Sequence, residues 1–346
     1  SVGAGSEYQP ANGPLFTRWA AQVSPTNSLP EYPRPQLVRS QWLSLNGMWE
    51  FQHAWADDLP PIGISLLEDI LVPFPVESAL SGVMRHVDRA WYRREFELPS
   101  VWSGQRVMLH FGAVDWEASV YFNGQALGSH YGGYDSFSFD ITDVLRPAGP
   151  QEIVVSVFDP TDSGEQPRGK QVHEPLDIWY TASTGIWQTV WLEPVPDTRV
   201  EGLRITADVD RGGVLVEVNV AGGVGEAWAQ VKVKQSGRPV AVKSGLSPGP
   251  FFLSVPNAIL WSPANPHLYD LEVKLFRDDV VIDEVGSYFG MRKISTVSID
   301  GVPRVFLNGE PLFQVGVLDQ GYWPDGIYTA PSDEALRFDI EMARSL

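Results

Sequence analysis

The chain has 346 residues and no cysteine, and its 43 acidic against 25 basic side chains give a formal net charge of −18. This length allows two or three domains, and the lack of cysteine excludes disulfides, thiolate metal sites and a cysteine nucleophile. The acidic charge argues against nucleic acid or an anionic membrane as a partner, because both require positive charge. No stretch approaches the length of a membrane span, whereas 13 tryptophans and 11 tyrosines are compatible with sugar rings stacking on aromatic faces.

The first part of the chain predicts an extended arm followed by an antiparallel β-sandwich. Residues 1–40 are rich in Pro, Ser and Asn, which is typical of a segment laid over another part of the protein. Over residues 41–195 short strands follow one another, and in the stretch 116–122 apolar and polar side chains alternate. Asn123-Gly124 then tolerates the positive φ of a two-residue hairpin turn. Strands of this length, interrupted by Gly and Pro, indicate a sandwich of two sheets.

A long irregular segment and a second series of strands come next. Between Asp159 and Gly185 the alternation lapses, and loops of this length inside compact domains are often functional. After a Pro-rich linker, strands recur over residues 196–292 at intervals of roughly 10 to 15 residues, with no helical pattern between them. This series predicts a small immunoglobulin-like β-sandwich, which has no cysteines and must rely on sheet packing alone.

The last segment, residues 293–346, has a different pattern. An apolar run over 312–318 predicts a strand, an aromatic Gly/Pro-rich loop follows, and Ser332 is a favourable N-cap for a closing helix. A strand, loop and helix in this order form the first unit of a (β/α)₈ barrel. One such unit cannot form a core by itself, so we expect a truncated start of a TIM barrel. The predicted fold class is therefore mainly β, with this single barrel unit at its end.

The order of these segments, together with several local motifs, resembles glycoside hydrolase family 2, the β-galactosidase, β-glucuronidase and β-mannosidase family. In that family the first sandwich is a jelly-roll, galactose-binding-like domain. The resemblance covers nearly the whole chain from about residue 36. The motifs that carry it occur in the family's order: SLNGMWEF (44–51), AWYRREFELP (90–99), HFGAVDWEASVYFNGQALGSHYGGYDSFSFDIT (110–142), TGIWQTVWLEPV (184–195), LWSPANPHLYDLEV (260–273), GMRKI (290–294) and FLNGEPLFQVGV (306–317).

The resemblance implies part of a retaining, exo-acting β-glycosidase that hydrolyses terminal β-linked sugars. In the family two glutamates on later barrel strands act as acid/base and as nucleophile. The acid/base glutamate follows an asparagine, and the sequence contains no Asn-Glu pair. We therefore expect no catalytic residue in these 346 residues, and the chain alone should be inactive. The stretch GVLDQGYWPDGIY (316–328) departs from the family's His-rich stretch after GVN, which weakens substrate assignment by analogy.

Four residues of the long loop are candidates for the rim of a sugar-binding pocket. Asp177 and Trp179 form an Asp-x-Trp motif, similar to one that contacts the sugar in the β-galactosidase branch. The motif makes a β-galactoside the first-choice substrate, and the alternative is an exposed carboxylate beside a packing tryptophan. Lys170 and Gln171 could donate hydrogen bonds to sugar hydroxyls or to a carboxylate, with a solvated loop face as the alternative.

Three further candidates follow the predicted barrel strand, at the face where barrel loops form catalytic sites. Asp319 could accept hydrogen bonds from sugar hydroxyls, and Trp323 could stack on a sugar ring. Tyr322 lies beside them in the same loop. The alternative is that both aromatic residues pack against the barrel or the first sandwich.

No cofactor and no metal ion are expected, because the six histidines are scattered without paired spacing. The expected partner is a carbohydrate substrate, with β-glucuronide and β-mannoside left open beside β-galactoside, and a homo-oligomer also stays open. The lack of cysteine and of an initial Met fits a secreted or periplasmic protein without requiring one. The alternative function is a non-catalytic carbohydrate-binding or scaffold protein of two β-sandwiches, which would leave the apolar faces of the last strand and helix uncovered.

Overall fold

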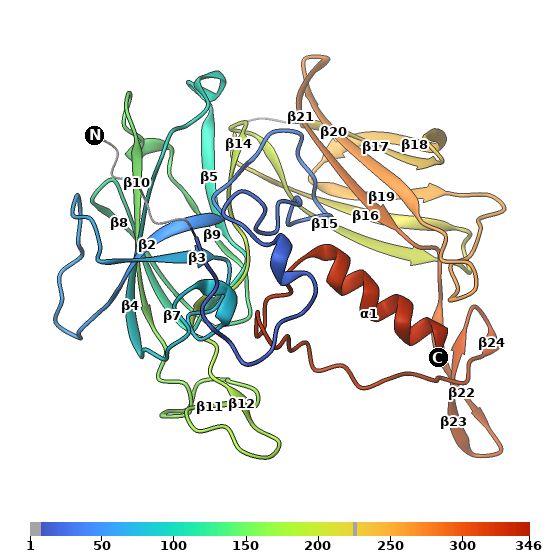
Figure 1. Ribbon diagram of the computed structural model, residues 1–346. Coiled ribbons are helices and arrows are strands. Elements are labelled where there is room, and N and C mark those ends of the chain that lie inside the picture. Colours follow the sequence, from blue (N-terminus) through green and yellow to red (C-terminus); the bar gives the residue numbers. More distant parts are fainter. Residues whose placement is uncertain (1–7, 224–226) are drawn as a thin grey trace. The chain divides into compact units, whose positions relative to one another are not determined.

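The computed structural model describes residues 8–223 and 227–346. The regular secondary structure of these residues is mainly β-strand (Figure 1). The mainly β prediction is therefore confirmed. None of the helices in these two ranges is long and apolar enough to cross a lipid bilayer. The described residues divide into two compact units: unit 1 comprises 8–33, 42–194 and 317–346, and unit 2 comprises 34–41, 195–223 and 227–316.

Unit 1 is built on a six-stranded and a four-stranded sheet. The six-stranded sheet has the order β3 (Glu68–Val72), β2 (Gly47–His53), β4 (Arg89–Phe96), β10 (Gln151–Phe158), β7 (Glu117–Phe122), β8 (Gln125–Tyr131). The four-stranded sheet has the order β1 (Leu43–Ser44), β14 (Val190–Val195), β5 (Arg106–Phe111), β9 (Phe137–Asp140). Two short pairs join β6 (Val114–Asp115) to β13 (Gly185–Ile186) and β11 (Gln171–Val172) to β12 (Tyr180–Thr181). Short 3₁₀ turns are η1 (Ala20–Gln22), η2 (Ala79–Ser81), η3 (Ser100–Trp102) and η4 (Thr142–Val144).

The hairpin of β7 and β8 shows how the sequence forms the core of unit 1. Ala118, Val120 and Phe122 alternate along β7 and are all buried in the main hydrophobic cluster. The turn follows at Asn123 (φ 49°) and Gly124 (φ 83°), so that Phe122 pairs with Gln125 across the hairpin. The predicted alternation and the predicted two-residue turn are both confirmed.

Unit 2 contains a three-stranded sheet, a four-stranded sheet and a small antiparallel ribbon. Their orders are β15 (Arg199–Asp208), β16 (Gly213–Ala221), β19 (Gly249–Ser254); β18 (Arg238–Ser247), β17 (Ala227–Gln235), β20 (Tyr269–Arg277), β21 (Val280–Phe289); and β22 (Ile294–Ile299), β23 (Val302–Leu307), β24 (Glu310–Pro311). Alternate residues such as Val216, Val231 and Val273 fill its core. A buried ion pair between Arg39 and Asp283 ties the segment 34–41 to β21.

The end of the chain forms the predicted helix but not the predicted strand. Helix α1 (Asp333–Ser345) begins after Ser332, whose hydroxyl accepts a hydrogen bond from Ala335 N at 3.2 Å, as the N-cap prediction requires. The sequence also predicts a strand over 312–318, but the structure has none there, and Phe313 is 88% exposed. A barrel strand forms hydrogen bonds to neighbours on both sides. Leu312 N donates to Val305 O of β23 at 3.0 Å, but within the described ranges no strand pairs with residues 313–318. The bounds of the four predicted domains stay predictions.

Candidate active site

The long loop that follows β10 is closed at its base by hydrogen bonds between its two ends. Asp159, directly after β10, accepts hydrogen bonds from Thr184 Oγ1 and from Thr161 N, both at 2.8 Å. Its own backbone N–H donates to Asp88 O at 2.8 Å. Asp159 and both threonines are buried, so these bonds fix the points at which the loop leaves and rejoins the sandwich.

Three buried carboxyl groups, those of Glu77, Asp115 and Asp159, belong to an interacting cluster at this loop base. Glu77 Oε2 accepts a hydrogen bond from Thr184 N at 2.9 Å. Burial, followed by the negative charges of Asp159 and Glu77, raises the pKa of Asp115 to about 8. Burial also raises the pKa of Asp159. The carboxyl of Asp115 is therefore mostly protonated and neutral at neutral pH.

The tip of the loop is held by the β11–β12 pair and by an aromatic contact with residue 322. Tyr180 N donates to Lys170 O at 2.9 Å, and the Lys170 ammonium lies 5.8 Å from the centroid of the Tyr180 ring. The Tyr322 ring packs on the Tyr180 ring, with the two centroids 4.1 Å apart. The Tyr322 hydroxyl donates to Thr181 O at 2.7 Å. The structure thus brings two predicted residues, Lys170 and Tyr322, to the same tyrosine ring.

Gln171 lies buried beside the tip, in a cluster of aromatic side chains. Its side chain is next to the Tyr134 hydroxyl, which in turn lies 3.4 Å from the Tyr328 hydroxyl. The Tyr328 ring packs against Trp187 and Tyr322, with centroids 5.2 and 5.0 Å away. Burial, with the neighbouring Tyr328, raises the pKa of Tyr134, so its hydroxyl remains protonated. The structure therefore buries Gln171, which is 2% exposed, among these aromatic side chains.

The segment 317–332 is bound to the sandwich of unit 1 by two buried side chains. Asp325 Oδ2 accepts hydrogen bonds from Thr17 N at 2.8 Å and from Thr17 Oγ1 at 2.7 Å. The Asp325 carbonyl accepts a further bond from Leu80 N at 3.0 Å. Thr329 Oγ1 lies 2.6 and 2.9 Å from two backbone carbonyl oxygens. These bonds hold the loop that carries three of the predicted site residues.

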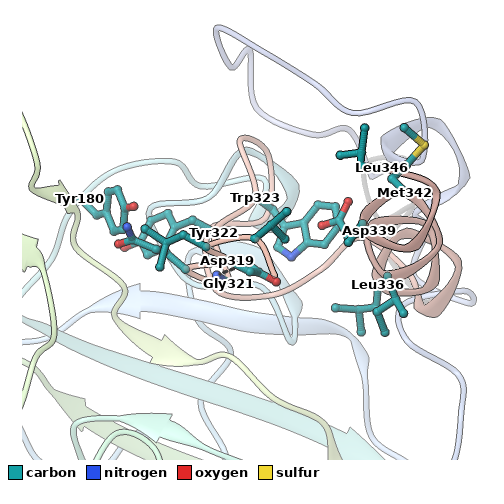
Figure 2. Close-up of a pocket in the computed structure, with 14 residues that line it drawn as sticks. Tyr180, Asp319, Gly321, Tyr322, Trp323, Leu336, Asp339, Met342 and Leu346 are labelled. Carbon is teal, nitrogen blue, oxygen red and sulfur yellow. Dashed lines mark hydrogen bonds between the residues drawn. The ribbon is translucent and has the colours of Figure 1, made fainter. Parts of the chain in front are cut away.

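Those three residues, Asp319, Tyr322 and Trp323, line a groove of about 750 Å³ beside α1 (Figure 2). Asp319 Oδ1 accepts a hydrogen bond from Gly321 N at 2.7 Å, which fixes the turn, and its carboxylate stays exposed. The Trp323 ring packs edge-to-face on Trp19, with centroids 6.3 Å apart. Tyr180, further residues of the segment 317–321 and one face of the helix complete the lining, and the helix contributes Asp339 as well as apolar residues such as Leu336 and Met342.

Asp177 and Trp179 lie at the exposed tip of the long loop and do not line this groove. Asp177 has a positive φ of 55°, and Trp179 N donates to Leu176 O at 3.0 Å in the same tight turn. The Trp179 side chain is 42% exposed, so its ring is open to a ligand from solvent. Their contact with a sugar stays a prediction.

Several residues of this site were missed by sequence reasoning. Asp325 reads as part of an ordinary Pro-Asp-Gly turn, and its buried partner Thr17 lies far away in the chain. Glu77 and Asp115 stand beside apolar stretches, and only the fold shows that they share a neighbourhood with Asp159. A carboxylate in a connecting segment or at a strand end is a weak signal, because such positions are usually solvated.

Two sequence profiles of one hydrolase family match this chain. The profile "Glycosyl hydrolases family 2, sugar binding domain" matches residues 36–196, and the profile "Glycosyl hydrolases family 2" matches residues 185–292. Together they cover most strands of both units. The chain therefore belongs to glycosyl hydrolases family 2.

Similar proteins carry two different activity names. A β-glucuronidase of Paenibacillus borealis is 27% identical over 315 residues, which are 82% of this chain and 50% of that protein. A β-galactosidase of Thermoanaerobacter pseudethanolicus is 26% identical over 243 residues, 64% of this chain and 30% of that protein. A solved β-glucuronidase from Ruminococcus gnavus in complex with D-glucuronic acid has a TM-score of 0.76 at 22% identity, covering 91% of this chain and 56% of that one. The chain spans about half the length, or less, of the curated relatives it matches.

Proposed function

We propose that this chain provides the scaffold and one wall of the sugar-binding pocket of a retaining, exo-acting β-glycosidase. A terminal β-galactoside is the first-choice substrate. The observation that carries the proposal is the contact between the long loop and the segment 317–332, where Lys170, Tyr180 and Tyr322 meet. Membership of a glycosyl hydrolase family supports it, because an aromatic and polar surface of this kind suits a sugar.

The proposed wall binds the sugar and does not transform it. The half-buried rings of Tyr180 and Trp323, which line the groove, would contact the apolar C–H face of a sugar ring. The Lys170 ammonium would donate a hydrogen bond to a hydroxyl, and the Asp319 carboxylate would accept one. Burial raises the pKa of Tyr322, so its hydroxyl remains protonated and keeps its bond to the loop.

Hydrolysis with retention requires two carboxyl groups about 5 to 5.5 Å apart on either side of the scissile bond. We propose that the acid/base and the nucleophile come from another part of the protein and face this wall. The buried pair Asp115 and Asp159 is not suited to that role, because both lie at the base of the loop, away from solvent. On this proposal the chain alone binds a sugar weakly and hydrolyses none.

The choice of a β-galactoside follows from the charge of the chain and from the Asp-x-Trp motif. A net charge of −18 disfavours an anionic sugar, and a carboxylate at Asp177 would repel a uronate further. A neutral sugar has hydroxyls that Asp177 can bind, and Trp179 beside it offers an exposed ring. Lys170 is the cation at the wall that would favour a β-glucuronide instead. Asp177 therefore favours a β-galactoside, whereas Lys170 favours a β-glucuronide.

The test is hydrolysis of a panel of nitrophenyl β-glycosides by the full-length protein. We expect turnover of the β-galactoside with retention of anomeric configuration, followed by proton NMR, and no turnover by the 346-residue chain. Replacement of Asp177 by Asn should raise KM for the galactoside at least several-fold. Asp143→Asn, which alters an acidic residue in η4, should leave KM unchanged.

Three outcomes would contradict the proposal. Hydrolysis by the isolated chain would mean that its own residues are catalytic. An inverted product would exclude a retaining mechanism. Binding of sugars by the full-length protein without hydrolysis of any glycoside would favour a carbohydrate-binding protein.

A further inference from the structure

A second cluster of polar side chains lies where the long loop passes the turn before β4. His86 and Asp88 come from this turn, and His173 comes from the loop, two residues after Gln171. One ligand atom from each of the three side chains lies within 4.8 Å of the other two. The imidazole rings of His86 and His173 meet edge-to-face, with their centroids 4.5 Å apart. Sequence spacing gave no sign of this cluster, since the two histidines are far apart in the chain.

The distances between the donor atoms of this cluster are close to those between the ligands of a metal ion. Ligands bound at about 2.1 Å to a tetrahedral zinc ion are roughly 3.3 Å from one another. His86 Nε2 lies 2.8 Å from Asp88 Oδ1, and the largest separation in the cluster is within 4.8 Å. Small rotations of exposed side chains would bring all three donors to the required distance. The side chain of Asp88 is 60% exposed, so an ion can reach the cluster from solvent.

The other ring nitrogen of His86 is held by a buried carboxylate. His86 Nδ1 lies 2.8 Å from Glu77 Oε1, and Glu77 is itself fixed by the hydrogen bond from Thr184 N. In the metal-free cluster Nε2–H donates to Asp88 Oδ1, so an ion that binds at Nε2 replaces this proton. A carboxylate behind a histidine is the usual outer shell of a zinc-binding imidazole, because it orients the ring and raises its basicity. Glu77 provides this outer shell without being a ligand.

A further carboxylate lies beside the second histidine. His173 Nε2 lies 3.2 Å from Asp162 Oδ1, and Asp162 also belongs to the long loop. This carboxylate can orient His173, and water would take the fourth position on the ion. Two imidazoles and one carboxylate suit Zn²⁺, whereas Ca²⁺ and Mg²⁺ prefer sets made of oxygen atoms only.

We propose that His86, Asp88 and His173 bind a divalent transition-metal ion, with Zn²⁺ as the expected occupant. The ion would cross-link the turn before β4 to the long loop. The loop also carries Lys170 and Tyr180, so the metal would hold the proposed sugar-binding wall in place from its outer side. Its role is structural, and no step of glycoside hydrolysis passes through it.

The experiment is titration of the chelator-treated full chain with zinc chloride, followed by calorimetry. We expect one zinc ion per chain, and at least tenfold weaker binding in His173→Gln and in His86→Gln. His53→Gln, which removes a histidine of β2 outside the cluster, is the matched control and should bind zinc like the unchanged chain. X-ray absorption of the zinc-loaded chain should show two imidazole ligands.

The melting temperature supplies a second readout. Zinc should raise it for the unchanged chain and for His53→Gln, because the ion binds the folded state. It should not do so for His173→Gln, whose exposed side chain can be replaced without disturbing the core. If His86→Gln fails to fold because Glu77 loses its partner, His173→Gln still decides the matter.

Zinc binding that is absent, or that is equal in His173→Gln and His53→Gln, would overturn the proposal. An absorption spectrum with oxygen ligands only would do the same. The measurement uses the metal alone and no glycoside, so its result is independent of the proposed hydrolase function. Conversely, a protein that fails to hydrolyse every glycoside can still bind zinc at this cluster.

Discussion

Replacement of Asp115 by Asn should change the pH dependence of stability in unit 1. Burial and the neighbouring carboxylates raise the pKa of Asp115 from 3.8 to about 8. The folded chain therefore keeps a proton that the unfolded chain releases near pH 4, so stability falls as pH rises between these two values and then levels off. Each pH unit lowers the free energy of unfolding by about 1.4 kcal/mol, and the whole range amounts to roughly 6 kcal/mol as an upper bound.

An asparagine keeps the shape of the neutral carboxyl and cannot ionise. Asp115→Asn should therefore lack this loss, so its stability relative to the unchanged chain should increase steadily from pH 5 to pH 8. Above the folded-state pKa of about 8 the difference should become constant. The absolute difference also contains the change in hydrogen bonding that the amide brings to the cluster. The slope against pH is therefore the quantity to measure.

The assay is urea unfolding at several pH values, followed by tryptophan fluorescence. Of the 13 tryptophans, all but Trp228 and Trp261 belong to unit 1, so the signal reports mainly on this unit. Asp135→Asn, which alters an exposed carboxyl close to Gly132, is the control and should follow the unchanged chain. Parallel curves for Asp115→Asn and the unchanged chain would refute the reasoning, because they would mean that Asp115 does not hold the proton.

Three further changes test separate contacts. Asp325→Asn should weaken both bonds from Thr17 and lower the stability of the bound segment 317–332 by about 1 to 3 kcal/mol. Proteolysis within 317–332 should become faster, and an unchanged rate of cleavage would contradict the prediction. Tyr322→Phe keeps the ring but removes the bond to the loop, so unfolding should cost about 0.5 to 1.5 kcal/mol less by urea titration, and an unaltered midpoint would argue against it. Arg39→Met leaves Asp283 buried without its ion pair and should destabilise unit 2 by about 3 to 5 kcal/mol; calorimetry measures this, and the double change with Asp283→Leu should recover most of the loss.

The parts of the fold that depend on local pattern could be predicted from the sequence. Alternation in β7, the Asn123-Gly124 turn and the N-cap at Ser332 each involve residues within a few positions of one another. Steric limits on φ and the period of a strand or helix act at this short range. For this reason the sandwich strands and the helix were predictable.

The candidate site was predictable only in part, because its decisive contacts join distant segments. The sequence showed that Lys170 and Tyr322 lie in loops, but the ring of Tyr180 that both contact was not among the candidates. Gln171 was expected as an exposed donor, and the fold buries it among tyrosines. The cluster of His86, Asp88 and His173, proposed above to bind zinc, is a stronger case, since the two histidines have no spacing in sequence that indicates a shared site.

The apolar run over 312–318 shows why a correct local pattern can still give no strand. Val315 and Leu318 are 87% and 85% exposed, and the run has the alternation that a strand requires. Backbone N–H and C=O groups gain nothing over water unless another strand edge receives them, and an isolated strand also bears the full entropic cost of ordering. The sequence pattern therefore indicates which conformation a segment can adopt. Whether the segment adopts it depends on a neighbouring strand whose edge can pair with it. A partner that supplies such an edge should order 312–318 into a strand, whereas α1 already satisfies its own backbone and needs no partner to form its hydrogen bonds.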